Sequence, residues 1–540
     1  MARVPANAKM KIPSAVAEVI SKLRAAGLEA YAVGGCVRDI LLSMKPKDWD
    51  VTTNALPEEI KNIFPESFYE NKFFTVTVKT EDEDPTLREI EVTTFRSEGR
   101  YEDLRHPGDV KPAKTLEEDL SRRDFTVNAI ALEIKNGKLE IKDPFNGRAD
   151  LEARIIRAVG DPEERFTEDA LRMLRAVRFA AELGFAIEEK TAAAIRAHAS
   201  SLQAISKERI RDELSKILMA DGVGPLRPRS EASEPARDFG TSVEGLAEPE
   251  KLTRLEAIGA TRAWIGLELL RELGLLRHVV PEIAEGIGVT QNKHHVYTVW
   301  EHNARALDFA AKNQWSLAVR IAALFHDIAK PRCKVGEGPD STFYNHDVVG
   351  AKMAYQILSR LRYPEKFTEI VAKLIRWHLF RYDYEGDAVE TTDSAIRRLI
   401  RNVGEENIQE LVKVRMCDRI GSGVPKAVPY RLRHFQFRVE KVLREHEAVK
   451  VTMLQVGGAD VMKILGIAPG PKVGHVLNAL LEEVLDDPSK NTREYLESRI
   501  KNLGTMSDEE LIRLREQAES RVELLEDQRE QEIKKKYYVK

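Results

Sequence analysis

The run Gly34-Gly35-Cys36-Val37-Arg38-Asp39, followed by Lys47-Asp48-Trp49-Asp50-Val51-Thr52, decides the fold of the N-terminal part of this chain. The apolar stretch Tyr31-Ala32-Val33 predicts a strand that leads into the glycine pair, and such a turn lets backbone N–H groups approach phosphate oxygens. Residues i and i+2 of a strand share a face, so Asp48 and Asp50 present two carboxylates together. Two hard oxygen ligands suit Mg²⁺ ions that hold a triphosphate. An isolated Asp-x-Asp is more often a solvated strand end, but a glycine turn before it indicates a phosphate site.

Length and composition restrict the class of protein. The 540 residues accommodate roughly three or four domains of about 150 residues, and a hydrophobic content of 43% argues against a disordered chain. The three cysteines lie far apart and in no metal-ligand spacing, which is typical of a reducing compartment. We find no signal-peptide pattern and no apolar run of about 20 residues, so the sequence predicts a cytoplasmic protein without membrane association.

Net charge is −4, but the basic residues are clustered. Such clusters occur at Arg397-Arg398 with Arg401, at Lys426 to Arg444, and at Lys534 to Lys536. A chain with this distribution can still bind a phosphate backbone through one face. The aromatic residues within Lys426–Arg444 fit an RNA-binding surface, and a helix whose arginines extend from a packed face is the alternative.

The residue patterns predict an α+β protein that is mostly helical. We expect a helix at 11–27, strands near 73–80, 88–96 and 140–141, and a helix from Asp124 to Leu132. The pattern is helical from 151 to 220, rich in Gly and Pro over 221–260, and helical again from about 252. The charged helix after Ser507 has no obvious partner and favours a solvated helix end. These patterns predict five parts: an α/β head at 1–150, a helical neck at 151–220, a linker or insertion at 221–260, a third domain at 261–445, and a helical tail at 446–540.

A second group of polar residues lies in the segment Glu168–Phe179. Asp169, Arg172 and Arg175 recur every three residues, with Arg178 after them, so a helix through all four places them on one face. Asp169 can then accept a hydrogen bond from a base amino group while Arg172 donates to a ring acceptor, and the other two arginines face phosphates. A ladder of salt bridges on a solvated face is the alternative for this segment.

Five motifs occur in order along the first part of the chain. They are Gly34-Gly35-x-Val37-Arg38-Asp39 with Asp48-x-Asp50, then Arg122-Arg123-Asp124-Phe125-Thr126-x-Asn128-Ala129, Asp143-Pro144-Phe145-x-Gly147, Glu168-Asp169-x-x-Arg172-x-x-Arg175-Ala176-x-Arg178-Phe179, and Ser206-Lys207-Glu208-Arg209-Ile210 with Glu213-Leu214. Together they resemble the class II tRNA nucleotidyltransferases, that is, the bacterial-type CCA-adding enzymes and their poly(A) polymerase relatives. The resemblance is dense over residues 28–220 and thinner to about 500.

This resemblance implies roles for individual residues. Asp48 and Asp50 would be catalytic and hold Mg²⁺, and Glu91 is a further acidic candidate near the metals, structural or catalytic. The nucleotide would be bound by Gly35, Arg38, Arg123, Asp169, Arg172, Arg175 and Arg178, of which Asp169 and Arg172 template the base. The implied substrates are CTP, ATP and tRNA, the last bound at its acceptor stem and elbow by shape. The tRNA 3′-hydroxyl would attack the α-phosphate in line, assisted by two metal ions.

Two further segments bear on the product. Gly99–Pro107 resembles the family's flexible loop, which favours full CCA addition over the addition of CC alone. The poly(A) branch carries a basic run where this chain reads Phe179-Ala180-Ala181-Glu182-Leu183-Gly184-Phe185, which is not basic. CC-adding, A-adding and poly(A)-adding enzymes stay open as alternatives. The segment Ile467–Gly474 resembles the family's C-terminal tRNA-contacting region, and an ordinary loop and helix start is its alternative.

A separate set of histidines and aspartates occurs between about 300 and 420. Imidazole and carboxylate together suit a divalent transition metal such as Mn²⁺ or Ni²⁺. Their order resembles the HD phosphohydrolase superfamily, with Lys330 also matching. The resemblance implies one metal on His302, His326, Asp327 and Asp418, and a second site or a phosphate-orienting role for His346 and His378.

Rival interpretations of the whole chain belong to other classes. One is an HD phosphohydrolase whose head senses nucleotides, against which the intact Asp48, Asp50, Asp169 and Arg172 speak. The other is a non-catalytic RNA-binding scaffold, which needs neither set of metal ligands. The HD region has its own alternative, a degenerate fold kept for binding tRNA. The sequence does not indicate the oligomeric state.

Overall fold

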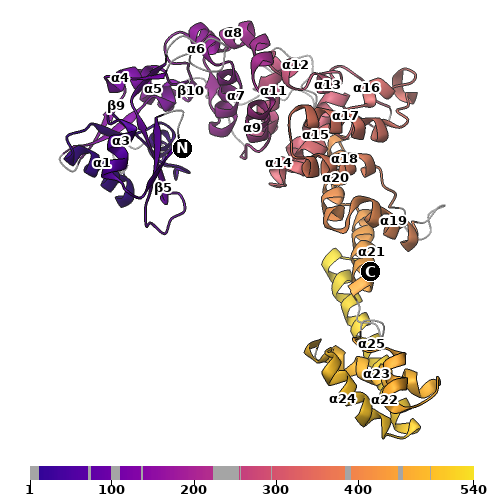
Figure 1. Ribbon diagram of the computed structural model, residues 1–540. Coiled ribbons are helices and arrows are strands. Elements are labelled where there is room, and N and C mark those ends of the chain that lie inside the picture. Colours follow the sequence, from indigo (N-terminus) through magenta and orange to yellow (C-terminus); the bar gives the residue numbers. More distant parts are fainter. Residues whose placement is uncertain are drawn as a thin grey trace. The chain divides into compact units, whose positions relative to one another are not determined.

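The computed structural model describes residues 11–70, 74–98, 110–135, 138–222, 255, 257–292, 295–382, 391–447, 454–486 and 488–539. The predicted flexible loop, Gly99–Pro107, and most of the predicted linker lie outside these residues. The chain forms two compact units, residues 1–378 with 413–425, and residues 379–412 with 426–540. Figure 1 labels the elements of both units.

The head is a mixed seven-stranded sheet in the order β3-β4-β5-β2-β1-β8-β9. Its strands are β1 (Ala30–Val33), β2 (Asp50–Thr53), β3 (Ser67–Glu70), β4 (Thr75–Lys79), β5 (Glu89–Thr94), β8 (Ala131–Lys135) and β9 (Lys138–Lys142). β2 pairs parallel with β5 and antiparallel with β1, so the strand that carries Asp50 is internal to the sheet. The helices of the head are α1 (Ser14–Ala25), α2 (Gly35–Leu41), α3 (Pro57–Ile63) and α4 (Leu116–Ser121). A separate hairpin consists of β6 (Arg96–Glu98) and β7 (Val110–Pro112).

One predicted element of the head is wrong. Instead of a helix from Asp124 to Leu132, the chain makes one 3₁₀ turn, Thr126–Asn128, and then enters β8. β8 lies between β1 and β9, and its first three residues are buried. A strand buried on both faces reads as a short apolar run, which periodicity alone does not distinguish from a helix.

The neck is helical except for a small two-stranded ladder. Its helices are α5 (Gly147–Ala153), α6 (Pro162–Glu168), α7 (Leu171–Leu183), α8 (Glu189–His198) and α9 (Lys207–Leu218). β10 (Ile155–Ile156) pairs with β11 (Ala186–Ile187), so the predicted helical pattern over 151–220 is interrupted twice. α7 packs against α9, and α11 (Arg262–Glu272) packs against both.

The helices after α11 build the second set of candidate ligands. They are α12 (Leu276–Val279), α13 (Pro281–Ala284), α14 (Val299–Lys312), α15 (Leu317–Phe325), α16 (Lys330–Cys333), α17 (His346–Arg360), α18 (Glu365–Trp377) and α20 (Ile408–Gly421). α14 packs on α15, and α18 packs on both α15 and α17. Four of the six candidate ligands therefore lie at ends of packed helices.

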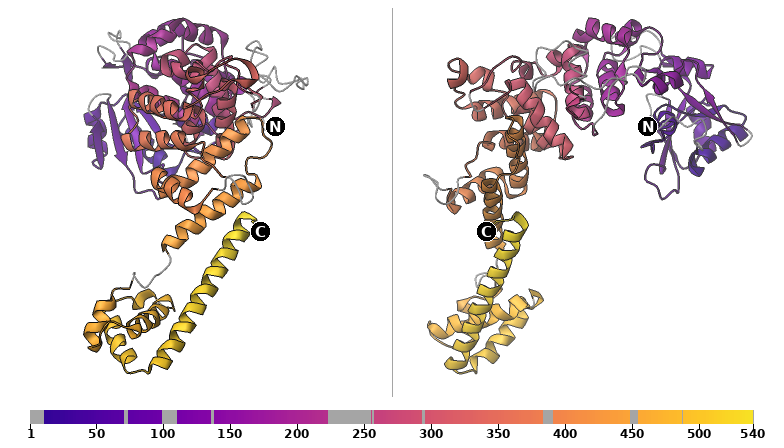
Figure 2. Two further views of the ribbon diagram at one scale, coloured as in Figure 1. Left: turned by 90° about the vertical axis from the view of Figure 1, so that its right-hand side faces the viewer. Right: turned by 180° about the vertical axis from the view of Figure 1, so that it is seen from behind.

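The second unit contains α19 (Asp393–Val403), α21 (Tyr430–Glu447), α22 (Gly458–Leu465), α23 (Pro471–Asp486), α24 (Arg493–Gly504) and α25 (Asp508–Tyr537). The expectation of a tail helix without a partner is wrong, because α25 packs against α23 and α21 (Figure 2). Ile533 is 3% exposed and forms a small core with Phe437. Phe435 is buried as well and stacks on Phe380. Phe435 and Phe437 of α21 thus pack inside this unit. This fits the alternative interpretation of 426–444, a helix whose arginines extend from a packed face, rather than an aromatic RNA-binding surface.

The prediction of a mostly helical α+β protein with a small sheet-containing head is confirmed. Among the described residues, no helix is both long enough and apolar enough to span a membrane.

Candidate functional site

The two carboxylates of the head lie at the start of β2. The strand begins at Asp50, and Asp48 precedes it as an exposed residue rather than as part of the strand. Trp49 between them is only 4% exposed and packs into the interior, and Asp48 lies close enough to Asp50 for its charge to raise the pKa of Asp50. In the parallel ladder, Asp50 is paired with Glu91 of β5. Three acidic residues therefore gather at one place, as the sequence predicted for Asp48 and Asp50 and suggested for Glu91.

The pKa of Asp50 reports the electrostatics of this place. Its pKa is raised to about 6: burial has the largest effect, the negative charges of Asp48 and Glu91 add to it, and the nearby Arg123 opposes it. A carboxylate that is desolvated and surrounded by like charge is stabilised in its ionised form by a divalent cation. The donor set, made only of carboxylate oxygens, fits Mg²⁺.

The glycine turn brings cations to the same place. Gly34 has φ +83°, and a Cβ atom there would lie 2.7 Å from Nη1 of Arg123 and 3.6 Å from Oδ2 of Asp50. The guanidinium of Arg38 donates to Oδ1 of Asn128 at 2.8 Å and to the neighbouring Asp39. Glycine is needed because only a residue without a side chain leaves room for Arg123 in this conformation.

The neck residues do not form the predicted single face. α6 ends at Glu168 and α7 begins at Leu171, so Asp169 precedes the helix that carries the arginines. Its carboxylate accepts from the backbone N of Leu171 at 3.0 Å and from Arg209 at 2.7 Å. Arg172 donates to Glu168 at 2.5 Å and to the carbonyl of Arg122 at 3.0 Å. Asp169 and Arg172 thus each have partners in the protein.

Arg175 and Arg178 are paired with carboxylates. Arg175 Nε donates to Asp124 Oδ2 at 2.8 Å, and Arg178 Nε donates to Glu213 Oε2 at 2.6 Å. Arg178 is 9% exposed and also reaches Glu182 at 2.9 Å. Arg178–Glu182 is a pair within one helix face, as in the salt-bridge alternative. The pairs of Arg175 with Asp124 and of Arg178 with Glu213 instead join segments far apart in sequence, and only the second is buried on both sides.

Phe179 organises the arginines on its ring. The guanidinium carbons of Arg38, Arg175 and Arg178 lie 5.3, 5.3 and 4.0 Å from its centroid. Phe125 packs edge-on against the same ring at 5.8 Å. Because cations favour the face of an aromatic ring, this arrangement links the head, which carries Arg38, to the neck.

Several residues of this region had no assigned role in the sequence. Asp124 and Asn128 belong to the second motif, and Arg209 and Glu213 belong to the fifth. Each one holds a predicted nucleotide-binding residue through a hydrogen bond or ion pair. Their positions inside the motifs were the one indication in the sequence that these residues matter. Which residue each one contacts depends on the fold.

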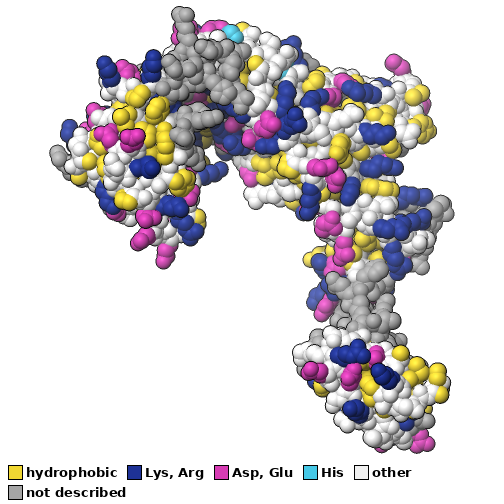
Figure 3. Space-filling model, viewed as in Figure 1, with side chains coloured by type: hydrophobic (Ala, Val, Ile, Leu, Met, Phe, Trp, Pro, Cys, Tyr) yellow, Lys and Arg dark blue, Asp and Glu magenta, His cyan; other side chains and the backbone are white. Residues whose placement is uncertain are grey.

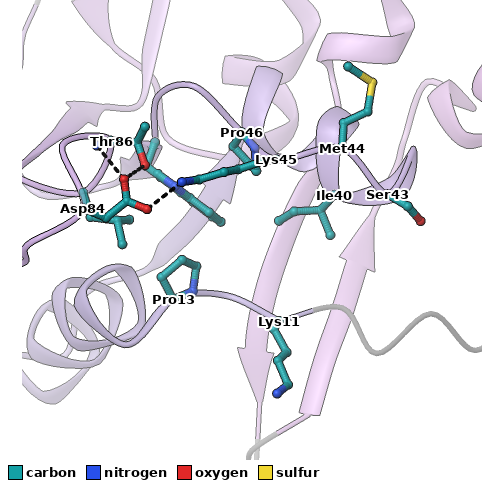
Figure 4. A pocket seen from close by; sticks show the side chains of 11 residues that line it. Lys11, Pro13, Ile40, Ser43, Met44, Lys45, Pro46, Asp84 and Thr86 are labelled. Atoms are coloured by element: carbon teal, nitrogen blue, oxygen red, sulfur yellow. Dashed lines mark hydrogen bonds and ion pairs between the residues drawn. The ribbon is translucent and has the colours of Figure 1, made fainter.

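A cavity of about 320 Å³ is lined by Trp49 and by residues of the segment 40–46 (Figure 4). It is lined by Ile40 and Met44 among others, and none of the predicted site residues lines it. Figure 4 shows Asp84 held by Thr86 and by Lys45, whose Nζ is 2.8 Å from the carboxylate. Asp84 is the acidic residue of the lining, and it is already paired with Lys45.

The second cluster brings together all six predicted residues of the HD region. The ligand atoms of His302, His326, Asp327 and Asp418 lie within 4.8 Å of one another. Asp327 also belongs to a second group, with His346 and His378, that meets the same limit. Oδ2 of Asp327 lies 3.0 Å from Nε2 of His302, and Oδ1 lies 3.3 Å from Nε2 of His346. One carboxylate thus faces two groups of imidazoles.

Backbone carbonyls orient three of these imidazoles. Nδ1 of His326, His346 and His378 lies 2.8, 2.6 and 2.7 Å from the carbonyl oxygen of the residue three positions earlier. An N–H donated there leaves the Nε2 lone pair directed into the cluster, the arrangement that metal-bound histidines use. In the part of the chain that the structure describes, Nε2 of His346 and of His378 have no hydrogen-bond partner.

The charges of the cluster also fit a cation. Burial lowers the pKa of His378 to about 3, so its imidazole is neutral. Burial would lower the pKa of His326 too, but Asp327 and Asp418 raise it to about 10. Lys330 Nζ lies 2.6 Å from Asp327 Oδ2 and donates to Gln291. The buried carboxylates thus attract positive charge, from Lys330 and from a protonated imidazole. Together with the imidazole nitrogens that have no hydrogen-bond partner in the described parts of the chain, they form a donor set that fits a divalent transition metal.

Family models match three parts of the chain. The poly A polymerase head domain matches residues 30–157, the "Probable RNA and SrmB- binding site of polymerase A" matches 184–224, and the HD domain matches 299–422.

Individual relatives agree with these matches. A CCA-adding enzyme of Streptococcus thermophilus is 30% identical over 88% of this chain and 94% of its own length. One of Lactobacillus helveticus is 50% identical over 38% of this chain, and the match spans about half (49%) of that relative. The solved structure of the Bacillus stearothermophilus CCA-adding enzyme in complex with CTP is 28% identical, covers 91% of this chain and 98% of that one, and superposes with a TM-score of 0.55.

Proposed function

Because this chain belongs to the family of the CCA-adding enzymes, we propose that it adds C, C and A to the 3′ ends of tRNA from CTP and ATP. The observation that carries this proposal is the gathering of Asp48, Asp50 and Glu91 beside Arg123 and the Gly34 turn. Carboxylates for the cation and guanidinium groups for the phosphates are the groups that nucleotidyl transfer requires.

The proposed roles follow from where each side chain lies. Asp48 and Asp50 would hold Mg²⁺, which when bound neutralises the triphosphate and makes the 3′-hydroxyl more acidic. Arg38 and Arg123 would bind the phosphates, because both guanidinium groups lie beside the glycine turn. Asp169 and Arg172 would read the base, and Arg209 and Glu168 hold them in place until it binds.

Recognition of tRNA would use basic side chains outside the head. Figure 3 shows Lys and Arg side chains gathered over α19, on which Arg397, Arg398 and Arg401 are exposed. The opposite face of α19 is buried through Ile396 and Leu399. A helix fixed by its apolar face in this way presents charge to a phosphate backbone without contacts to bases, as recognition of every tRNA requires.

The test is incorporation on a tRNA transcript that lacks its 3′ end, with CTP alone, ATP alone and both. We expect growth by two nucleotides with CTP and by three with both. Growth by two only, an A added only to a transcript ending in CC, or long ATP ladders would identify a CC-adding, A-adding or poly(A)-adding enzyme. No growth would refute the proposal.

Variants test the residues. Asp48→Ala and Asp50→Asn should abolish incorporation without changing the affinity for tRNA. The matched control is Asp84→Asn, whose carboxylate lies in the same head but pairs with Lys45. Asp169→Ala should reduce the discrimination between CTP and ATP more than it weakens tRNA binding, and unchanged discrimination would contradict base recognition by this residue.

A second activity is favoured by the buried HD cluster, in which Nε2 of His346 and of His378 has no hydrogen-bond partner among the described residues. We propose that the HD region holds Mn²⁺ or Ni²⁺ and hydrolyses phosphate esters, with His302, His326, Asp327 and Asp418 around one position and His346 and His378 around another. The test is the metal content of the purified protein. Wild type should retain metal, His326→Ala with Asp327→Ala should lose it and the hydrolase activity, and incorporation should persist. A wild-type chain that binds no transition metal would indicate a degenerate scaffold instead.

A further inference from the structure

One buried carboxylate of the head has no role in the proposed chemistry and yet contacts several parts of the site. Asp119 lies in α4, and its side chain is 0% exposed. Its Oδ1 accepts from Arg122 Nη2 at 2.8 Å and from the backbone N of Arg96 at 3.3 Å. Its Oδ2 accepts from Thr52 Oγ1 at 3.1 Å and lies 3.7 Å from Arg123 Nη2.

Three of these four contacts, those with Thr52, Arg123 and Arg122, lead to different components of the nucleotide site. Thr52 follows Asp50 by two positions in β2, so the two side chains share a face of that strand. Arg123 is the cation next to Gly34 and Asp50. The carbonyl of Arg122 accepts from Arg172 Nη2 at 3.0 Å, and Arg172 is the proposed base-reading arginine.

We propose that Asp119 is a positioning residue of the nucleotide site, which orients Arg123 toward the phosphates and holds the backbone of Arg122 against Arg172. This inference rests on the proposed nucleotidyl transfer for its site but not on which nucleotides are added. The physical reason is that a fully buried carboxylate requires charged hydrogen-bond donors. Two of its charged partners are Arg122 and Arg123: Arg123 is the proposed phosphate-binding residue, and the carbonyl of Arg122 accepts from the proposed base-reading Arg172.

The core next to Asp119 is filled by other residues, so the role of its carboxylate can be tested separately from packing. Leu120, the next residue in α4, lies in the core with Phe95 and Ala129. Asp119 itself makes polar contacts, with Arg122, Arg96, Thr52 and Arg123. An asparagine of the same size therefore removes the charge while the core beneath stays filled. Asn keeps one acceptor oxygen, and its N–H₂ group cannot accept from Arg123 or Thr52.

The test compares Asp119→Asn with Glu117→Gln in the full-length chain. Glu117 is an exposed residue of the same helix, so its replacement makes the same change of charge without a buried contact. We expect Asp119→Asn to raise the KM for CTP and the dissociation constant of Mg·CTP about tenfold, with the KM for tRNA within twofold of wild type. Its melting temperature should fall, because Arg122 loses the buried charge with which it is paired. The control variant should match wild type in all four quantities.

Two results would overturn the proposal. One is a KM for CTP within twofold of wild type. The other is an equal increase of the KM values for CTP and tRNA, which indicates a purely structural role. If Asp119→Asn does not fold, Thr52→Val decides, because it removes one donor without changing charge, and the KM for CTP should rise about threefold. A wild-type chain without any incorporation refutes the proposed function, and the Mg·CTP affinities of the variants still decide the role of Asp119.

Discussion

Replacement of Glu213 by Gln should destabilise the junction between α7 and α9 by about 3 kcal/mol. Glu213 and Arg178 form a buried ion pair whose side chains are 5% and 10% exposed, with Nε and Oε2 2.6 Å apart. Loss of one partner from a buried pair typically costs about 3–5 kcal/mol, because the other charge stays desolvated. Arg178 retains Glu182 at 2.9 Å, so we expect the lower end of that range.

The assay is amide hydrogen exchange in the full-length protein, since a chain of two units does not unfold in one step. Peptides from α7 and α9 should exchange roughly a hundredfold faster in Glu213→Gln than in wild type. This factor corresponds to a loss of about 3 kcal/mol of local stability. The matched control is Glu182→Gln, because the carboxylate of Glu182 is 30% exposed and an exposed pair contributes less than about 1 kcal/mol.

The same variant tests whether Arg178 is held by the protein or is available to the nucleotide. α9 also carries Arg209, which holds Asp169, so a loosened α9 should reduce the discrimination between CTP and ATP. Equal exchange rates in the two variants would refute the reasoning, as would a local change below about 1 kcal/mol. Either result would mean that the buried pair does not anchor α7.

Two further predictions concern the junction between head and neck. Burial alone would raise the pKa of Asp124, but the guanidinium of Arg175 outweighs burial and brings it to about 2, below the ordinary 3.8. A depressed carboxyl pKa stabilises the folded state above the ordinary value, so a contribution of about 2 kcal/mol should be complete above pH 4 and lost as pH falls from 3.8 to 2. Hydrogen exchange of α7 should therefore differ between wild type and Asp124→Asn at pH 6, and the difference should shrink at pH 3; a constant difference would contradict the assignment. Phe179→Leu keeps an apolar side chain but removes the ring that Arg38, Arg175 and Arg178 contact. Since a cation–π contact contributes about 0.5–2 kcal/mol, we expect a severalfold higher KM for CTP. An unchanged KM would mean that the ring does not orient the arginines.

Features encoded by neighbouring residues could be predicted from the sequence. The strand at Tyr31, the glycine turn and the carboxylates of Asp48 and Asp50 all lie within about twenty positions of one another. The ligands of the HD cluster are distant in sequence but could be listed from their order, because His and Asp in that pattern are uncommon. Their division into two groups around Asp327 depends on the packing of helix ends and was visible only in the fold.

Features that depend on distant partners could not be predicted. The periodicity of Asp169, Arg172 and Arg175 suggested one helical face, but the partners that fix the arginines are Glu168 nearby and Asp124 fifty-one positions away. Likewise α25 reads as a charged helix, because its partners lie in α21, about ninety positions earlier. Ile533 packs with Phe437, and Glu530 pairs with Lys441. A long-range ion pair leaves no period in either segment.

The two ligand sets differ in the way each would take up its metal. In the head, Asp48 is exposed and Asp50 is partly exposed at the start of a strand, and the repulsion among carboxylates is relieved only in part by Arg123. Such a site has high affinity for a cation only when a phosphate supplies further oxygens, so Mg²⁺ should enter with the nucleotide and leave with pyrophosphate. In the HD region, His302, His326 and Asp327 are 0–1% exposed, and backbone carbonyls fix the imidazoles of His326, His346 and His378. Buried, preoriented nitrogen ligands favour a metal that is retained through turnover. The two proposed sites therefore predict different behaviour: the cation of the head should exchange with the substrate, whereas the cation of the HD region should stay with the folded protein.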